Sequence, residues 1–209
     1  MLKRGGRLLL RPWEVLLKEG PGPFIRAAGR KIHLGWLKLR QWKPYKERPR
    51  GLDFGTPQHF DVICLPIINW DYRFQRPQHL SVQLAAQGCR VFYGSINVVL
   101  TDDEKIAAPL ITHLQERIWN FQFPSLSEKP INIYEDELEE DRFLDTLGNL
   151  AEQAGINAAV LLVDFPSWGS LALKARERFG WRVVYDCMED HAGFSHLPVA
   201  TVQEKEIAL

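Results

Sequence analysis

Short apolar runs alternate with helical patterns along most of this 209-residue chain. Predicted strands cover residues 60–66, 89–93, 117–123, 158–163 and 181–185, and predicted helices cover 77–87, 136–154 and 168–179. A strand that is apolar without interruption is buried on both faces, which is typical of a parallel sheet covered by helices. The pattern therefore predicts an α/β fold, a Rossmann-like doubly wound parallel sheet.

The charge distribution divides the chain into two regions. The whole sequence has a net charge of zero, but residues 1–50 carry +11 and the remainder carries −11. The zero total excludes a uniformly basic nucleic-acid-binding protein, and we expect no nucleic-acid partner. Proline and glycine interrupt the chain repeatedly between residues 43 and 58. We therefore expect a linker at 51–58 and a folded domain over 59–209.

Residues 1–50 are predicted to form a basic, amphipathic helical segment. Phe24, Ala28, Ile32 and Trp36 recur at helical spacing and form an apolar stripe. The stripe fits either a linker helix that packs on another domain or a helix that lies on an anionic membrane surface. No secretory signal and no membrane-spanning apolar run is found in the sequence. We expect a cytoplasmic protein, peripheral on the inner face of the membrane in the second case.

The cysteines and acidic residues give no metal-binding pattern. Cys64, Cys89 and Cys187 are far apart in apolar runs, so we expect buried, reduced thiols in a reducing compartment. The acidic run 186–191 has no second ligand cluster to complete a metal site, so we expect no metal. No glycine-rich fingerprint follows the first strand, so we also expect no tightly bound nicotinamide cofactor.

Ligands of doubly wound sheets bind beyond the carboxyl ends of the strands, and the loop after the first predicted strand is unusual there. It combines Trp70, Arg73, Gln75 and Arg76 with the start of a helix. Free backbone N–H groups at a helix N-terminus, together with arginine side chains, attract anions such as phosphate. In the alternative interpretation, the aromatic residues plug the edge of the sheet and Arg76 pairs with a structural carboxylate.

Two further loops place acidic residues directly after predicted strands. Asp164 follows a fully apolar run, where a carboxylate can act as a general base or bind sugar hydroxyls. Alternatively, Asp164 or Ser167 caps the following helix. The third loop supplies the remaining candidate substrate-binding residues, which are Asp186, Glu189 and Asp190.

These loops resemble motifs of a known enzyme group. Residues 60–65, the run WDYRFQRPQHL at 70–80 and the run GCRVFY at 88–93 closely resemble the start of bacterial GT-B glycosyltransferases. The similar members are those of glycosyltransferase family 4 and the teichuronic-acid-type enzymes. The run VVYDCMED at 183–190 resembles a second motif of the same group. The resemblance covers residues 59–209.

The resemblance implies the N-terminal, acceptor-side domain of a glycosyltransferase. Such an enzyme transfers a sugar from a nucleotide-sugar donor to a hydroxyl of a glycan or lipid-linked acceptor, in cell-envelope or surface-polysaccharide assembly. The donor would bind a second Rossmann-like domain. Because the sequence ends within a predicted helix, we expect a fragment that is inactive by itself. GT-B enzymes generally need no bound metal or tightly bound cofactor.

One position departs from the pattern of that group. Many members carry a histidine where this sequence has Asp164. An aspartate suits an inverting mechanism, in which it deprotonates the acceptor hydroxyl, whereas a retaining enzyme would use it only to orient the sugar. A non-catalytic Rossmann-like module that binds a glycan or a protein partner is the rival hypothesis.

Overall fold

A computed structural model describes residues 52–127, 131, 139–189, 203–204, 206–207 and 209. The chain divides after Lys46 into two units, and the described residues belong to the second. The predicted basic helical segment 1–50 lies outside the described residues, and so does Asp190 of the second unit.

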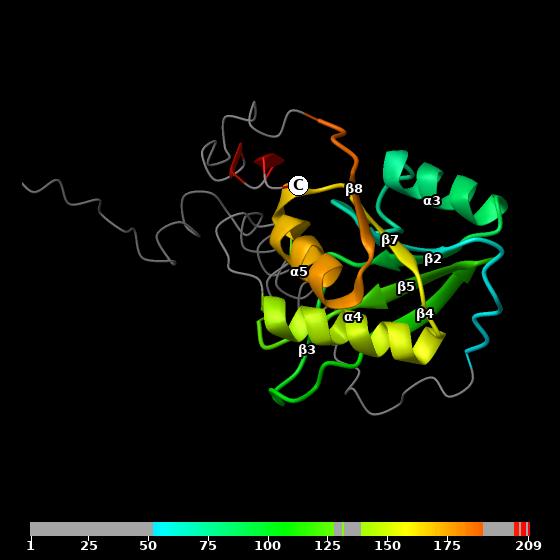
Figure 1. Cartoon of the computed structure of the whole chain (residues 1–209). Coiled ribbons are helices and arrows are strands. Elements are labelled where there is room, and N and C mark those ends of the chain that lie inside the picture. The colour runs from blue at the N-terminus through cyan, green and yellow to red at the C-terminus, as the bar shows by residue number, and fades with distance from the viewer. Residues whose placement is uncertain (1–51, 128–130, 132–138, 190–202, 205, 208) are drawn as a thin grey trace, which may run out of the picture. The chain divides into compact units, whose positions relative to one another are not determined.

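The described chain forms a six-stranded sheet in the order β4-β5-β2-β1-β7-β8 (Figure 1). Its strands are β1 (Asp61–Leu65), β2 (Arg90–Gly94), β4 (Leu110–Gln115), β5 (Ile118–Gln122), β7 (Ala159–Val163) and β8 (Arg182–Tyr185). Neighbouring strands run parallel, except that β4 pairs antiparallel with β5 at one edge. The two-residue strands β3 (Val99–Leu100) and β6 (Pro124–Ser125) pair separately.

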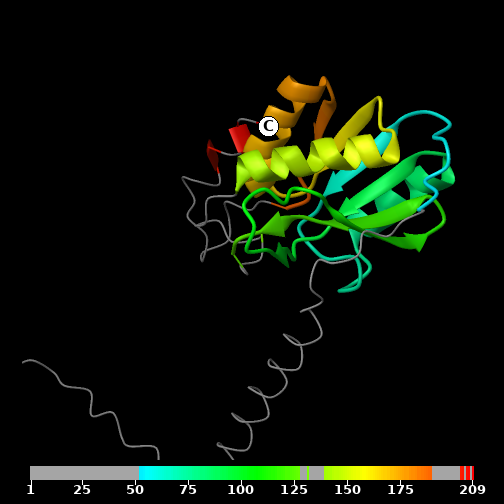
Figure 2. The ribbon, with the colours of Figure 1, turned by 90° about the horizontal axis from the view of Figure 1, so that it is seen from below.

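Helices cover both faces of the sheet, as Figures 1 and 2 show. Helix α3 (Arg76–Ala86) covers one face, and α4 (Glu140–Ala154) and α5 (Gly169–Phe179) cover the other. A short 3-10 helix, η1 (Pro166–Trp168), leads into α5. Alternate residues of each central strand therefore pack into opposite layers. This arrangement confirms the predicted α/β, Rossmann-like doubly wound sheet.

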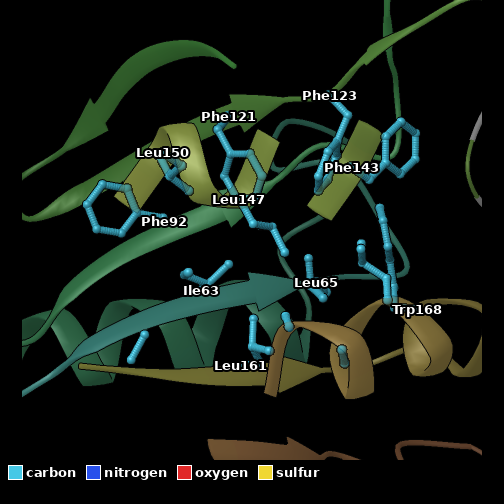
Figure 3. Close-up of a cluster of buried hydrophobic side chains, with 14 of the residues drawn as sticks. Ile63, Leu65, Phe92, Phe121, Phe123, Phe143, Leu147, Leu150, Leu161 and Trp168 are labelled. Carbon is cyan, nitrogen blue, oxygen red and sulfur yellow. The ribbon is translucent and has the colours of Figure 1, made fainter. Parts of the chain in front are cut away.

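The larger core lies between the sheet and the layer of α4 and α5 (Figure 3). The Phe123 ring contacts those of Phe121, Phe143 and Trp168, and the ring centroids of Phe123 and Phe143 are 4.5 Å apart. Trp168 is fully buried, and its Nε1 donates to the Pro66 carbonyl at 2.9 Å. The loop between β7 and α5 is thus anchored to the end of β1.

A buried ion pair ties several elements together at the opposite, amino end of the central strands. Arg90 and Asp61 are 2% and 1% exposed, and the guanidinium donates to both carboxylate oxygens at 2.7 Å. Arg90 also donates to the carbonyls of Gly55, Ala154 and Gly155. One side chain thereby links β1 and β2 with the end of α4 and the chain before β1.

The structure adds details that the sequence patterns did not predict. The antiparallel strand β4 was not predicted, and the second predicted helix begins at Glu140 within the described residues. The segment expected to be a linker also contributes to the domain. Leu52 and Phe54 pack against the larger core, with the Phe54 ring 5.3 Å from that of Trp119.

Candidate functional site

Three parallel strands deliver two carboxylates to the same edge of the sheet. Asp164 follows β7, and its backbone N–H donates to the Leu65 carbonyl at the end of β1. Asp186 follows β8, and its N–H donates to the Val163 carbonyl at the end of β7. Each carboxylate is therefore fixed by a continuation of the parallel ladder, at the edge where ligands of such sheets bind.

Asp164 lies in an environment that favours its neutral form. The side chain is fully buried, and its Oδ2 accepts a hydrogen bond from the Cys64 thiol at 3.3 Å. Burial raises the pKa of Asp164 to about 7; the Cys64 hydrogen bond opposes this rise, Asp186 adds to it and Arg76 opposes it. Oδ1 is buried without a hydrogen-bond partner among the described residues. A carboxyl that titrates near neutrality can accept or donate a proton.

The helix-cap interpretation of this loop does not hold. Neither η1 nor α5 has a hydrogen bond from a side chain at its cap. The Ser167 hydroxyl is buried and, within the described part of the chain, has no hydrogen-bond partner. Among the described residues, the Asp164 Oδ1 and the Ser167 hydroxyl are thus buried oxygens without a hydrogen-bond partner, which is uncommon in native folds.

Arg76 reaches the same edge from α3 and forms a bidentate ion pair with Asp186. Its Nε and Nη2 donate to the two carboxylate oxygens at 2.7 and 2.8 Å. This is the contact that the alternative interpretation of Arg76 predicted. The Arg76 side chain is nevertheless 61% exposed, whereas that of Asp186 is 13% exposed. One side of the guanidinium therefore remains open to solvent and to an anionic ligand.

The start of α3 offers fewer free N–H groups than the sequence suggested. Pro77 has no N–H, and Gln75 and Gln78 form a reciprocal capping box that occupies the Gln78 N–H. The His79 N–H donates to the Gln75 carbonyl. An anion at this edge would therefore meet mainly arginine side chains rather than backbone donors.

The loop before α3 divides into a buried and an exposed part. Trp70 is half-buried, and its ring lies 5.1 Å from that of Tyr93, as the plug interpretation predicted. Tyr72 and Phe74 are 66% and 54% exposed and do not plug the sheet. Arg73 is exposed and lies over the Tyr72 ring at 5.6 Å. The predicted residue Gln75 is also exposed, at the helix N-cap.

The acidic loop after β8 is only partly described. Glu189 is exposed, and its carbonyl accepts a 3.7 Å hydrogen bond from the thiol of Cys187. Cys187 is exposed, so the expectation that all three cysteines are buried was wrong for this one. It follows the edge strand of the sheet, where no further strand covers it in the described chain. Within the described residues, no group of histidine, cysteine and carboxylate side chains has the geometry of a metal site.

The sequence patterns missed two residues of this edge. By its pattern, Cys64 is one more residue of an apolar strand, yet its thiol donates a hydrogen bond to Asp164. Burial, and to a lesser extent the nearby Asp164 charge, raise the pKa of Cys64. Gln78 is fully buried and bonds to the loop before α3. Of these two residues, Gln78 could have been noticed in the sequence, as a polar residue in the first turn of a predicted helix. Cys64 could not, because a cysteine in an apolar strand looks like its neighbours.

No family model and no curated protein matches the sequence. Among solved structures, the chain is similar to the sucrose-phosphate synthase of Thermosynechococcus elongatus, with 11% identity and a TM-score of 0.42. The match covers 60% of this chain and 32% of the synthase. No helix in the described residues is long and apolar enough to cross a membrane.

Proposed function

We propose that this domain is the acceptor-side half of a GT-B glycosyltransferase and that Asp164 is its general base. The whole enzyme would transfer a sugar from a nucleotide-sugar donor to a hydroxyl of a glycan or lipid-linked acceptor, in cell-envelope or surface-polysaccharide assembly. The donor would bind a second domain, because the described residues form one such sheet domain. The enzyme would work in the cytoplasm, with the basic residues 1–50 held at an anionic membrane surface.

The observation that carries this proposal is the state of Asp164. A buried carboxyl with a pKa of about 7, one oxygen of which has no partner among the described residues, lies at the carboxyl edge of a parallel sheet. A general base is most effective when its pKa is close to the working pH. In the proposed reaction, an Asp164 oxygen takes the proton of the acceptor hydroxyl. The acceptor oxygen then bonds to the anomeric carbon, and the nucleoside diphosphate leaves.

The remaining residues of the edge have supporting roles in this proposal. Arg76 and Arg73 would meet a phosphate of the donor or of a lipid-linked acceptor, since arginine pairs well with phosphate. Trp70 would contact a sugar ring. Candidate partners for sugar hydroxyls are Gln75, Asp186, Glu189 and Asp190. In this proposal the nucleotide sugar is a substrate, and the reaction uses no tightly bound cofactor and no bound metal.

Asp164 is sealed from solvent, so the proposal requires the edge to open when the acceptor binds. The Arg76–Asp186 pair lies at this edge, and the exposed Arg76 guanidinium is a group that a charged acceptor could meet. Exchange of Asp186 for an acceptor phosphate would keep Arg76 paired. Burial of Asp164 before the acceptor binds would limit its contact with water.

The same burial favours a second candidate, a non-catalytic module that binds glycans. In that case Asp164 and the Arg76–Asp186 pair are structural, and no transfer occurs. Two measurements separate the candidates. Binding of glucose-, galactose- and N-acetylglucosamine-containing oligosaccharides to the 209-residue chain is measured by calorimetry. Transfer is measured with the full polypeptide that the gene encodes, as nucleoside diphosphate released from UDP- and GDP-sugars with the same acceptors.

A glycosyltransferase should bind an acceptor and release nucleoside diphosphate only when both substrates are present. Binding without release would favour the binding module. If the protein showed no oligosaccharide binding and no nucleoside diphosphate release, both candidate functions of this edge would be contradicted. The 209-residue chain alone should release no nucleoside diphosphate, because its described residues form one sheet domain.

A further inference from the structure

Gln78 directs its whole side-chain amide at the loop that precedes α3. It is fully buried in the first turn of the helix. Its Nε2 lies 2.8 Å from the Arg73 carbonyl, 3.2 Å from that of Asn69 and 3.4 Å from that of Trp70. Its Oε1 accepts the backbone N–H of Gln75 at 3.1 Å. All four of these contacts fall within residues 69–75.

The start of the same loop is held by a second set of contacts, which does not involve Gln78 and comes from the end of β2 and the residues after it. The Asn69 Oδ1 accepts hydrogen bonds from the Ser95 hydroxyl at 2.8 Å and from the Ile96 N–H at 3.1 Å. The Tyr93 hydroxyl donates to the Ile68 carbonyl at 2.8 Å. The loop is therefore attached at its beginning to β2 and the two residues after it, and to Gln78 along its length.

Only a primary amide can make this set of contacts. The loop offers three carbonyls and one N–H, which require donors and an acceptor on the same planar group. A glutamate in its charged form keeps the acceptor but has no donor, and a methionine has neither. A side chain that served only to stabilise α3 would have no need to bond to the loop.

We infer that Gln78 is a positioning residue, which fixes the backbone of residues 69–75 in the shape that presents Trp70, Arg73 and Gln75. That these three side chains meet the acceptor rests on the proposed function. By turning carbonyls of the loop toward the buried amide, Gln78 holds the segment that leaves Tyr72 and Phe74 exposed. A loop ordered in advance loses less conformational entropy when a ligand binds.

The test compares Gln78→Met, which removes donor and acceptor, with Thr146→Val. Thr146 is also fully buried and bonds through its hydroxyl to a carbonyl of its own helix, but it lies in α4. Amide hydrogen exchange is measured over 69–75, β1 and β7 in the 209-residue chain. Gln78→Met should speed exchange over 69–75 by about tenfold or more, because local hydrogen bonds set local opening. Thr146→Val should not.

Two results would overturn the inference. One is amide exchange that speeds up equally over residues 69–75 and the strands in both variants. The other is unchanged exchange over residues 69–75 in Gln78→Met. If Gln78→Met does not fold, Gln78→Glu takes its place, since it keeps the acceptor oxygen and the size of the side chain. The same variants are titrated with the oligosaccharides above, and acceptor affinity should fall about fivefold or more as the loop loses order. If the unmodified chain binds no oligosaccharide, the proposed function fails, while the exchange comparison still decides whether Gln78 positions the loop.

Discussion

Two charged neighbours act on Asp164 in opposite directions. Burial is the main cause of its raised pKa, the charge of Asp186 raises it further and the charge of Arg76 lowers it. Because Arg76 and Asp186 are paired with each other, any ligand that separates them changes the proton affinity of Asp164. The ion pair and the buried carboxyl therefore form one electrostatic unit at the residue scale.

Asp164→Asn should make the protein more stable at alkaline pH and leave it nearly unchanged below pH 4. The folded protein keeps the Asp164 proton between pH 3.8 and about 7, where the unfolded chain has lost it. The contribution of Asp164 to stability is therefore complete below this range, falls as pH rises through it, and is constant above it. The stability gap between variant and parent should widen by up to about 1.4 kcal/mol per pH unit in this range.

Urea unfolding at several pH values measures this gap, with Asp145→Asn at an exposed ion pair as the control. A gap that does not vary with pH would mean that Asp164 is charged in the fold at neutral pH.

Arg76→Ala should raise the pKa of Asp164, because it removes the positive charge that lowers it. In the enzyme, it should raise KM for the charged substrate more than it lowers kcat, if its contact is the same in ground and transition states. The Asp164 carboxyl is followed by carbon-13 NMR titration, and KM is measured by nucleoside diphosphate release. Arg178→Ala, at another exposed ion pair, serves as the control. A lower pKa of Asp164 in Arg76→Ala would contradict the account.

The sequence allowed the edge of the sheet to be located but not its pairings. Asp164 and Asp186 each follow an apolar run, and Arg76 begins a helix, so their shared edge follows from parallel strand order. The pairing of Arg76 with Asp186 depends on β7 and β8 being neighbours, which spacing along the chain does not specify. The thiol of Cys64 was indistinguishable from its apolar neighbours.

At the scale of elements, Arg90 joins parts of the fold that are distant in the sequence. Its guanidinium bonds to Asp61 in β1, to the chain before β1 and to the last turn of α4. A buried charge that loses its partner is strongly destabilising, even where the pair itself contributes little net stability.

Arg90→Met should therefore lower the free energy of unfolding by about 3–5 kcal/mol, because it leaves the Asp61 carboxylate buried and unpaired. Urea unfolding measures this loss, and Arg178→Met, at the surface of α5, should cost far less. If the double variant Arg90→Met/Asp61→Asn lost as much free energy of unfolding as the two single variants together, the two residues would not be coupled.

Periodicity predicted the central elements because both their faces are buried, but it missed β4, which forms a hairpin with the predicted strand β5. The turn between these strands contains Glu116 and Arg117 rather than the Asn-Gly type of signal. Arg117 adopts a positive φ of 59°, and its side chain donates to the Thr56 and Gly88 carbonyls. Tertiary contacts thus stabilise a turn that local sequence preferences disfavour.

At the scale of the whole molecule, the folded unit begins earlier than the apolar pattern. A chain of residues 47–209 should unfold in one cooperative transition. A chain of residues 56–209 should also fold, but with a free energy of unfolding lower by about 1–3 kcal/mol, because it lacks the Phe54 ring that packs on Phe92 and Trp119. Thermal unfolding of both chains, with Phe54→Ala in the longer one, measures the difference. Equal stabilities would show that residues 47–55 contribute nothing to the domain.

The most direct measurement of the central claim is turnover by Asp164→Asn in the full polypeptide that the gene encodes. The variant keeps the shape of the side chain and removes the base, so nucleoside diphosphate release should fall by about two to four orders of magnitude. Acceptor affinity should stay close to that of the parent, and Asp145→Asn should retain normal turnover. Near-normal turnover by Asp164→Asn would contradict the account and leave Asp164 as a buried structural acid.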